Sequence, residues 1–522
     1  MSNPIKERSA LNTKLNIRPI FFNTAHELAY EGPCRFNSRE TMTPEFEKMM
    51  SNESERSVME GIKKNLDPDK YEILETHRFN SYSDTWAISE DDMKVLCSGS
   101  EVTDLYIVSP GMAAGEVIKE FALRVQKPII LISNDVGISM YRTSLRARGC
   151  EVYSFLCWED AKKTLNVLRA RKILAETTVM CVTRFNGTLS EQSAADSFIN
   201  LETVTKVLGT HFRMINIHEF IDQLEEIDPT TNHTLPGRPM NNINAGDMAE
   251  IEKIADELIG GAKECRMEKK HVITSLKAYK LIQKLLERYD CNAFTMPCPD
   301  ACSTCRLNKE QFTVCLAHSL NIEGGIPSAC EYDISAALSQ AALHAVSGHP
   351  SYMGNTNVIS RPEGGSVNDF MGNFAAMVVG REGWEELTKQ PNLVATGHSV
   401  PNRYMHGYDS EPTEYSIAPF AYSGFGATLR HDFKADAGQV ITMCRFTPNC
   451  DGILIARGKI VYGYGYDTVN CTLGVVFEVS DSRDFFEKQA FSGNHTPLVY
   501  GDYVDDMIML AKSLGIKPIV CA

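Results

Sequence analysis

Three short stretches decide the fold of the N-terminal part of this chain: residues 104–110 (DLYIVSP), 128–134 (PIILISN) and 151–156 (EVYSFL). Each is an apolar run rich in β-branched residues, and helical patterns such as the one over 115–126 separate them. Short apolar strands that alternate with helices are typical of βαβ units, in which consecutive strands lie parallel in one sheet. The sequence therefore predicts a first α/β domain over residues 1–165.

A second set of the same kind follows along the chain. Residues 177–183 (TTVMCVT) and 212–217 (FRMINI) have the composition of strands, and two amphipathic helices come after them. On each helix the apolar residues share one face: Met248, Ile251, Ala255 and Leu258 on the first, and Leu276, Tyr279, Ile282 and Leu286 on the second. These patterns predict a second α/β domain over residues 166–350, and both domains are expected to be Rossmann-like, with parallel sheets.

The pattern changes beyond residue 350. Residues 439–446 (QVITMCRF), 453–456 (ILIA) and 473–479 (LGVVFEV) are β-type runs, and glycines space them. Helical periodicity is weak over 418–478, so a mainly antiparallel sheet or barrel is favoured there. Residues 351–522 are therefore predicted to form a β-rich, barrel-like C-terminal domain.

Composition and charge exclude several classes of protein. The net charge is −15, from 52 basic and 67 acidic residues, and no long basic run offers a surface for nucleic acid. No run of about 18 or more uncharged apolar residues predicts a membrane span. The first residues, MSNPIKERSALNTK, lack the apolar segment of a secretory signal. We therefore expect a cytoplasmic protein whose 16 cysteines stay reduced.

The most conspicuous motif is a group of cysteines, Cys298, Cys302 and Cys305, with Cys315 ten residues beyond the last of them. Thiolates at such spacing can hold an iron–sulfur cluster or a structural zinc ion. The segment follows two α/β units instead of opening a barrel, and three such cysteines among 16 are weak support for a cluster. Reduced thiols that line or support a site are the favoured interpretation, and a cluster stays open as the alternative.

Three polar segments point to a metal site. The block GIPSACEYD delivers Glu331 to the head of an apolar helix, where a carboxylate is in the simplest case only a capping group. Residues 351–358 (SYMGNTNV) place Asn355 among small residues, and residues 492–502 (SGNHTPLVYGD) place His495 between a polar turn and an apolar strand. A carboxylate, an amide and an imidazole in one cavity would suit a hard divalent cation with open positions.

Taken together, these segments resemble the L-fucose isomerase family, which comprises L-fucose/L-arabinose isomerase-like sugar isomerases. Residues 16–20 (NIRPI) are similar to the family's first strand with its substrate-contacting arginine, and the block around Glu331 is similar to the segment with its metal-binding glutamate. Asn355 follows Glu331 by 24 residues, the spacing of the family's second ligand, and residues 493–495 are similar to its Asn-His turn. The blocks keep their order, so the resemblance covers nearly all of the chain.

The resemblance implies that Mn²⁺, or another divalent cation such as Mg²⁺, is held by Glu331, Asn355 and His495, with Glu331 and Asn355 at the catalytic centre. Four further residues fall in or near family segments that contact the sugar: Arg18, His398, Phe425 and Asn494. Family members are hexamers with the active site at a subunit boundary. A homo-oligomer, hexameric or built from trimers, is therefore expected, with Arg18 serving a neighbouring chain.

One position departs from the family pattern. The second ligand there is an aspartate that also acts as an acid/base group, whereas this chain has Asn355. An asparagine carbonyl can ligate a cation, but it is neutral and cannot take a proton. We therefore expect weaker metal binding, with proton transfer carried by Glu331 or shared with Asp333 or His398.

The predicted function is metal-dependent aldose–ketose isomerisation of a hexose, or of a deoxy or 6-substituted sugar, through an ene-diol. Because Asn355 replaces the expected aspartate, an epimerase or a retro-aldol lyase on the same fold stays open. So do a non-catalytic sugar-binding relative and an iron–sulfur protein. The sequence leaves the sugar and its charge undetermined, because specificity lies in the pocket and not in the fold.

Overall fold

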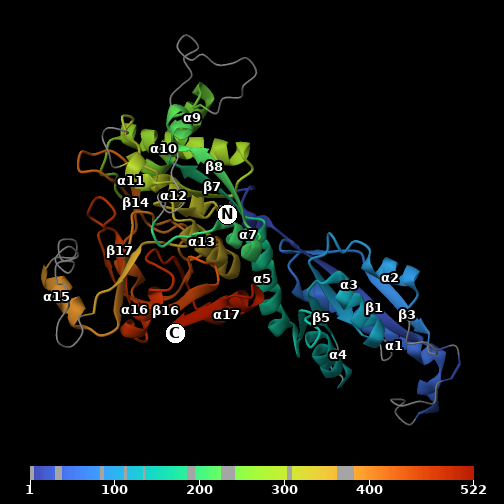
Figure 1. Ribbon diagram of the computed structural model, residues 1–522. Coiled ribbons are helices and arrows are strands. Elements are labelled where there is room, and N and C mark those ends of the chain that lie inside the picture. Colours follow the sequence, from blue (N-terminus) through green and yellow to red (C-terminus); the bar gives the residue numbers. More distant parts are fainter. Residues whose placement is uncertain are drawn as a thin grey trace. The chain divides into compact units, whose positions relative to one another are not determined.

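The computed structural model describes residues 5–26, 28–29, 38–82, 88–110, 115–132, 136–184, 194–224, 242–302, 308–360 and 381–521. The chain forms two compact units (Figure 1). The N-terminal unit is Asn12–Arg169, and the main unit joins Met1–Leu11 to Ala170–Ala522. Nearly all of the predicted segment 166–350 and the whole of 351–522 thus belong to the main unit.

The N-terminal unit is built on a six-stranded parallel sheet with the order β2-β1-β4-β5-β6, in which β3 also pairs with β1. Its strands are β1 (Leu15–Ala25), β2 (Tyr71–Ile73), β3 (His77–Tyr82), β4 (Leu105–Ser109), β5 (Ile129–Leu131) and β6 (Val152–Ser154). Its helices are α1 (Pro44–Asn65), α2 (Glu90–Cys97), α3 (Gly115–Val125), α4 (Val136–Arg146) and the first part of α5 (Trp158–Ala175). The three predicted strands over residues 104–156 are confirmed as β4, β5 and β6, and so is their parallel pairing.

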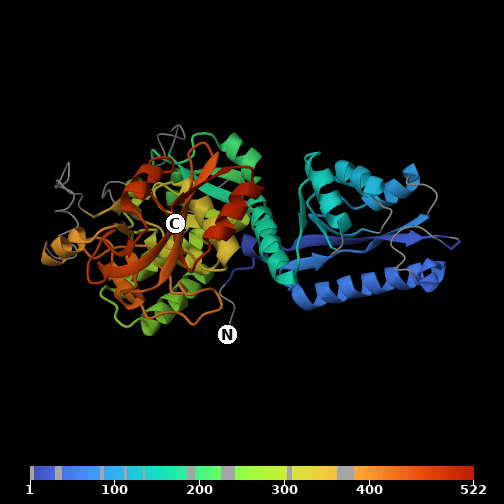
Figure 2. The same cartoon turned by 90° about the horizontal axis from the view of Figure 1, so that it is seen from below.

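Helices cover both faces of this sheet, which explains why β4 and β5 are buried throughout. Successive side chains of a strand point to opposite faces. Accordingly, Ile17 and Phe21 of β1 pack in one cluster with residues of α1 and α5, whereas Ile20 and Phe22 pack in another with residues of α2, α3 and α4. Figure 2 shows α1, the long blue helix, on one face and the lighter blue and cyan helices on the other.

The main unit contains a four-stranded parallel sheet with the order β10-β9-β7-β8. The strands are β7 (Thr178–Thr183), β8 (His211–Asn216), β9 (Ala293–Thr295) and β10 (Ser328–Ala329). The accompanying helices are α7 (Leu201–Leu208), α8 (Ile217–Asp222), α9 (Ala245–Gly261), α10 (Lys269–Arg288), α11 (Cys298–Cys302), α12 (Cys315–Glu323) and α13 (Ile334–Ser347). The predicted apolar faces of α9 and α10 pack in the largest core cluster, as expected.

A seven-stranded, mainly antiparallel sheet follows, with the order β11-β12-β17-β16-β15-β18 and with β19 parallel to β16. Its strands are β11 (Asn355–Val358), β12 (Leu393–Gly397), β15 (Val440–Phe446), β16 (Gly452–Tyr464), β17 (Gly474–Glu478), β18 (Leu498–Tyr500) and β19 (Lys517–Cys521). A two-stranded antiparallel sheet consists of β13 (Ser416–Pro419) and β14 (Ala427–Arg430). The remaining helices are α15 (Arg381–Lys389), α16 (Ser482–Gln489) and α17 (Val504–Ser513).

The predicted barrel is wrong, because no continuous ladder closes the large sheet within the described residues. Its outermost strands, β11 and β18, have four and three residues, and among the described residues no ladder joins them. Two isolated bridges, Tyr352 with Leu498 and Asn355 with His495, join the chain near these strands instead. The bridges place Asn355 beside His495.

Two further findings concern the sequence predictions. Among the residues that the structure describes, no helix is long and apolar enough to cross a membrane. The described cysteines are all free thiols, as expected.

Candidate functional site

Glu331 lies where the parallel sheet of the main unit meets α13. It follows the end of β10 by two residues, at the carboxyl edge where open α/β sheets place their binding sites. Glu331 and Tyr332 both have left-handed backbones, with φ of 60° and 57°. Such conformations cost about 1–3 kcal/mol each for residues other than glycine, and they cluster at functional sites. The Tyr332 N–H group donates to Met296 O (2.8 Å), which helps to hold the turn.

Two histidines from the antiparallel sheet face the Glu331 carboxylate. His398 directly follows β12, and its Nε2 lies 3.4 Å from Glu331 Oε1. His495 precedes β18, and its Nε2 lies 3.6 Å from Glu331 Oε2. One potential ligand atom from each of the three residues lies within 4.8 Å of the others, and both imidazoles are buried. Three segments far apart in the sequence thus bring one carboxylate and two imidazoles together.

A contact to Asp333 fixes the orientation of the His495 ring. Its Nδ1 lies 3.0 Å from Asp333 Oδ2, and within the described part of the chain its Nε2 has no hydrogen-bond partner. Because an ionised carboxylate only accepts hydrogen bonds, Nδ1 carries a proton, and Nε2 faces Glu331. A carboxylate that orients a histidine in this way is typical of metal sites.

Asp333 is ionised because a buried arginine neutralises it. Burial on its own would raise the pKa of Asp333, but the Arg445 guanidinium and the His495 ring hold it well below its usual value. Arg445 donates to Asp333 Oδ2 at 2.7 Å and to the carbonyls of Ser492 (2.6 Å) and His495 (2.8 Å). Asp333 also caps α13 by accepting from Ala336 N at 3.0 Å. This network ties the His495 turn to the head of α13.

The electrostatics of the cluster favour a negative Glu331. The hydrogen bond from His398 lowers the pKa of Glu331, and the nearby His495 ring acts in the same direction against the effect of burial. Burial would lower the pKa of His398, but the neighbouring Cys471 and Glu331 raise it well above its usual value. Without a cation, Glu331 and His398 therefore form a carboxylate–imidazolium pair, which a metal ion would replace with loss of the proton.

Two asparagines border the cluster. Asn494 donates from Nδ2 to Asn355 Oδ1 at 2.6 Å, and its own Oδ1 accepts from Thr356 N at 2.9 Å. The Asn494 N–H group donates to Asp196 Oδ2 at 2.5 Å. Asn355 is therefore next to His495, as the sequence analysis expected. Its Oδ1 retains a second lone pair that a cation or a sugar hydroxyl can use.

Arg18 and Phe425 are the remaining residues that the resemblance assigned to sugar contact. Arg18 belongs to the N-terminal unit, where its buried guanidinium donates to Thr103 Oγ1 (3.1 Å) and to Glu75 O (2.9 Å). Phe425 is buried in the loop that joins β13 to β14. Among the described residues, the contacts that gather Glu331, His398 and His495 include neither side chain.

Sequence analysis missed the residues that position this cluster. Arg445 and Asp196 were not singled out, although an arginine inside the apolar strand VITMCRF is a usable signal, because a buried arginine needs a partner. The residues near Cys298 also differ from the cysteines that the sequence motif grouped with it. Cys305 lies outside the described residues, and Cys298 approaches His318 and Cys330 instead.

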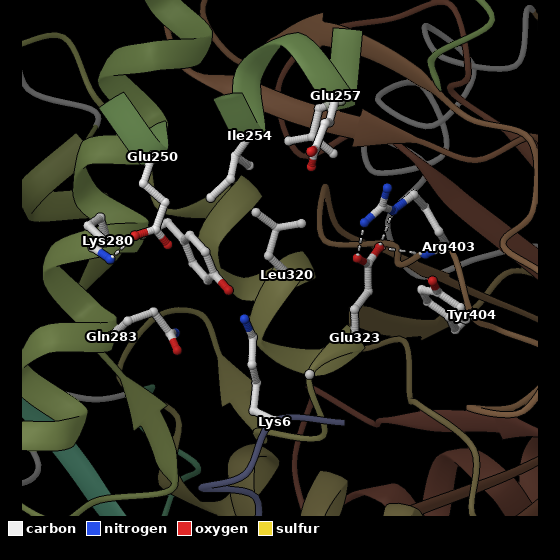
Figure 3. A pocket seen from close by; sticks show the side chains of 13 residues that line it. Lys6, Glu250, Ile254, Glu257, Lys280, Gln283, Leu320, Glu323, Arg403 and Tyr404 are labelled. Atoms are coloured by element: carbon white, nitrogen blue, oxygen red, sulfur yellow. Dashed lines mark hydrogen bonds and ion pairs between the residues drawn. The ribbon is translucent and has the colours of Figure 1, made fainter. Parts of the chain in front are cut away.

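A cavity of about 520 Å³ lies apart from these side chains (Figure 3). Its charged lining groups are largely paired with one another: Arg403 donates to both oxygens of Glu323, at 2.9 and 2.6 Å, and Lys280 contacts Glu250 at 2.6 Å. None of its lining residues belongs to the Glu331 cluster. The side chains that could hold a metal ion at the Glu331 cluster therefore do not line this cavity.

The residues of the cluster fit a divalent cation. One carboxylate and two imidazoles with open positions suit first-row divalent metals, and His495 Nε2, a buried ring nitrogen without a hydrogen-bond partner among the described residues, is an available ligand atom. Fold and site together define a mixed α/β protein with a candidate metal centre at the carboxyl edge of a parallel sheet. No protein-family model matches the chain, and a comparison with curated proteins finds no relative.

Proposed function

We propose that this protein is a metal-dependent aldose–ketose isomerase that acts on a hexose, or on a deoxy or 6-substituted sugar. The observation that supports the proposal is the convergence of Glu331, His398 and His495, with Nε2 of His495 facing the carboxylate. The sequence resemblance to L-fucose isomerases independently picked out Glu331, Asn355 and His495 as ligands.

Glu331, His495 and either His398 or Asn355 would hold the ion, with Mn²⁺ as the first choice and Mg²⁺ as the alternative. His398 is favoured over Asn355 as the third ligand because Asn355 Oδ1 already accepts a hydrogen bond from Asn494. When bound, a divalent ion polarises the sugar carbonyl and stabilises negative charge on the neighbouring oxygens. Three protein donors leave positions for two sugar oxygens.

The protein's own part in the reaction is to move a proton between C1 and C2 of the sugar. Glu331 is the candidate base, because its carboxylate is only partly buried and lies at the centre of the cluster. If Asn355 is the third ligand, His398, which contacts Glu331 Oε1, can accept or return a proton in relay. Asn355 and Asn494 offer amide groups that hydrogen-bond and orient sugar hydroxyls.

The test is proton exchange measured by NMR in D₂O, with metal-stripped protein, a panel of aldoses, and Mn²⁺ added or omitted. We expect one sugar to give its ketose and to take up deuterium at C1 or C2 only with metal. Glu331→Gln should reduce the rate by about 10²–10⁴-fold. Glu323→Gln is the matched control, since it removes a buried carboxylate in the cavity of Figure 3 and should leave exchange unchanged.

The outcomes distinguish the candidate functions. Deuterium uptake with retention of the aldose, or cleavage of the carbon chain, would replace isomerisation with epimerisation or retro-aldol chemistry. Sugar binding without any exchange would replace the enzyme with a sugar-binding protein. We further propose a cytoplasmic homo-oligomer, hexameric or built from trimers, which sedimentation of the full chain can test.

A further inference from the structure

A second group of donors lies behind Glu331, and the parallel sheet gathers it. Neighbouring strands β9 and β10 end at the same edge, and Cys298 and Cys330 follow them by three residues and by one. Helix α12, on the connection between these strands, carries His318. Sγ of Cys298, Sγ of Cys330 and a ring nitrogen of His318 all lie within 4.8 Å of one another.

His318 is held in a fixed orientation. Its Nδ1 lies 2.8 Å from Ser328 Oγ, which also accepts from Asn321 Nδ2 at 3.1 Å. Gln283 in turn donates to Asn321 Oδ1 at 2.7 Å, so the amide of Asn321 is fixed. The other ring nitrogen, Nε2, lies 3.5 Å from Cys298 Sγ.

We propose that Cys298, His318 and Cys330 form a binding site for a thiophilic divalent cation of the zinc class, separate from the Glu331 cluster. The spacing supports it: with usual zinc–ligand bond lengths and a tetrahedral angle, sulfur and nitrogen ligands stand about 3.6 Å apart. The Cys298–His318 separation of 3.5 Å is close to this value. Three protein donors leave a fourth position, which water fills in sites of that kind.

Charge and burial favour the same conclusion. His318 is 0% exposed and Cys330 1%, and both thiols belong to the main core cluster. Two thiolates without a counter-charge would be costly in an apolar core, whereas two thiolates and a zinc ion are neutral together. The Glu331 N–H group donates to Cys298 Sγ at 3.5 Å, the type of outer contact that metal-bound sulfur accepts.

The two sites differ in ligand type. Thiolates favour zinc over Mn²⁺ or Mg²⁺, whereas the carboxylate and imidazole groups of the Glu331 cluster accept a wider range of divalent metals. The sulfur site does not rest on the proposed isomerase activity. Cys330 precedes Glu331, so a bound ion would anchor the left-handed turn.

The test is titration of the full-length, metal-stripped chain with Co²⁺ under reducing, anaerobic conditions. Cobalt bound to thiolate gives a charge-transfer absorption band in the near ultraviolet, which the oxygen and nitrogen ligands Glu331, His398 and His495 do not give. We expect the band to saturate at one equivalent, to bleach on addition of Zn²⁺, and to be lost in Cys298→Ser. It should persist in Glu331→Gln and in Cys444→Ser, a buried thiol elsewhere in the main unit.

X-ray absorption of the zinc-loaded wild type provides a measurement that no variant can spoil by misfolding. One equivalent of zinc should show about two sulfur ligands near 2.3 Å and one nitrogen near 2.0 Å. Cobalt binding without the band, or zinc without sulfur neighbours, would overturn the proposal. Failure of sugar exchange with an intact band would count against the isomerase only, so the two proposals fail separately.

Discussion

Replacing Asp333 with asparagine tests whether this buried carboxylate strengthens the binding of a metal ion by His495. In Asp333→Asn one side-chain oxygen remains, which can accept from His495 Nδ1 in place of Oδ2 and keep the ring orientation, whereas the amide NH2 group replaces Oδ1 and cannot accept from Ala336 N. The negative charge 3.0 Å from the ring is lost. The His495 imidazole then becomes a weaker donor at Nε2.

The expected loss of Mn²⁺ affinity is about 10–100-fold, which corresponds to about 1.4–2.7 kcal/mol. A larger electrostatic loss is not expected, because Arg445, 2.7 Å from Asp333, already cancels most of the carboxylate's charge as felt by the ion. The variant also leaves Arg445 buried without its main partner, at a cost to folding of about 3–5 kcal/mol when such a pair is broken. Affinity should therefore be measured by calorimetry on protein shown to be folded by circular dichroism.

Asp436→Asn is the matched control. Asp436 is a second buried carboxylate in the main unit, 2.5 Å from His431 Nε2 and 2.6 Å from Tyr500 Oη, and it belongs to no metal cluster among the described residues. The control should lose stability and keep its Mn²⁺ affinity. The reasoning is refuted if Asp333→Asn binds Mn²⁺ as tightly as the wild type, or if both variants weaken binding equally.

Two other predictions concern stability, measured by denaturant unfolding. Gly493→Ala should cost more than the 1–3 kcal/mol of left-handed strain alone, because φ is 104° and a Cβ would lie 2.2 Å from Asp196 Oδ2. Gly515→Ala, with φ of 72° and open space around its Cβ, should cost only the strain, and equal losses would contradict this account. The pKa of Asp436 is lowered despite its burial, by the hydrogen bond to His431 and by Tyr500. The ionised Asp436 should therefore stabilise the fold above about pH 4, and this stabilisation should decline as the pH falls further. Asp436→Asn should remove that part of the stability loss in acid. An unchanged dependence of the free energy of unfolding on acid pH in the variant would contradict this account.

Much of the fold can be predicted from the sequence, because the hydrophobic pattern of each segment matches its burial in the folded protein. Strands β4 and β5 are buried throughout because helices cover both faces of their sheet, and the C-terminal strands were expected at 439–446 and 473–479. The barrel was wrong because ring closure depends on pairing between β11 and β18, and among the described residues only two isolated bridges join the chain near these strands. Pairing between strands far apart in the chain is set by tertiary packing and is not encoded in a hydrophobic pattern.

The candidate site could be predicted only in part, because it brings together residues that are far apart in the sequence. Glu331 was found because a carboxylate at the head of an apolar helix is a local feature. His398 was assigned to sugar contact, yet it faces Glu331 from 67 residues away, a proximity that β12 creates within the large sheet. The cysteine motif drew attention to residues close in sequence, whereas the adjacent ends of β9 and β10 bring Cys298 and Cys330 together.

The two donor groups meet at one turn, and their coupling can be measured. Cys330 belongs to the sulfur group and Glu331 to the other, and the turn holds two left-handed residues that are stable only if something fixes them. An ion in the sulfur site should therefore raise the Mn²⁺ affinity of the Glu331 cluster, and Mn²⁺ should raise zinc affinity by the same factor, since linkage is reciprocal. We expect a factor of about five or more, the lower end of typical couplings. Calorimetric Mn²⁺ titration with and without one equivalent of zinc measures it, with Cys444→Ser keeping the effect and Cys330→Ser losing it. Equal Mn²⁺ affinities with and without bound zinc would show that the turn is rigid by itself, held by its contacts to Met296 and Cys298 alone.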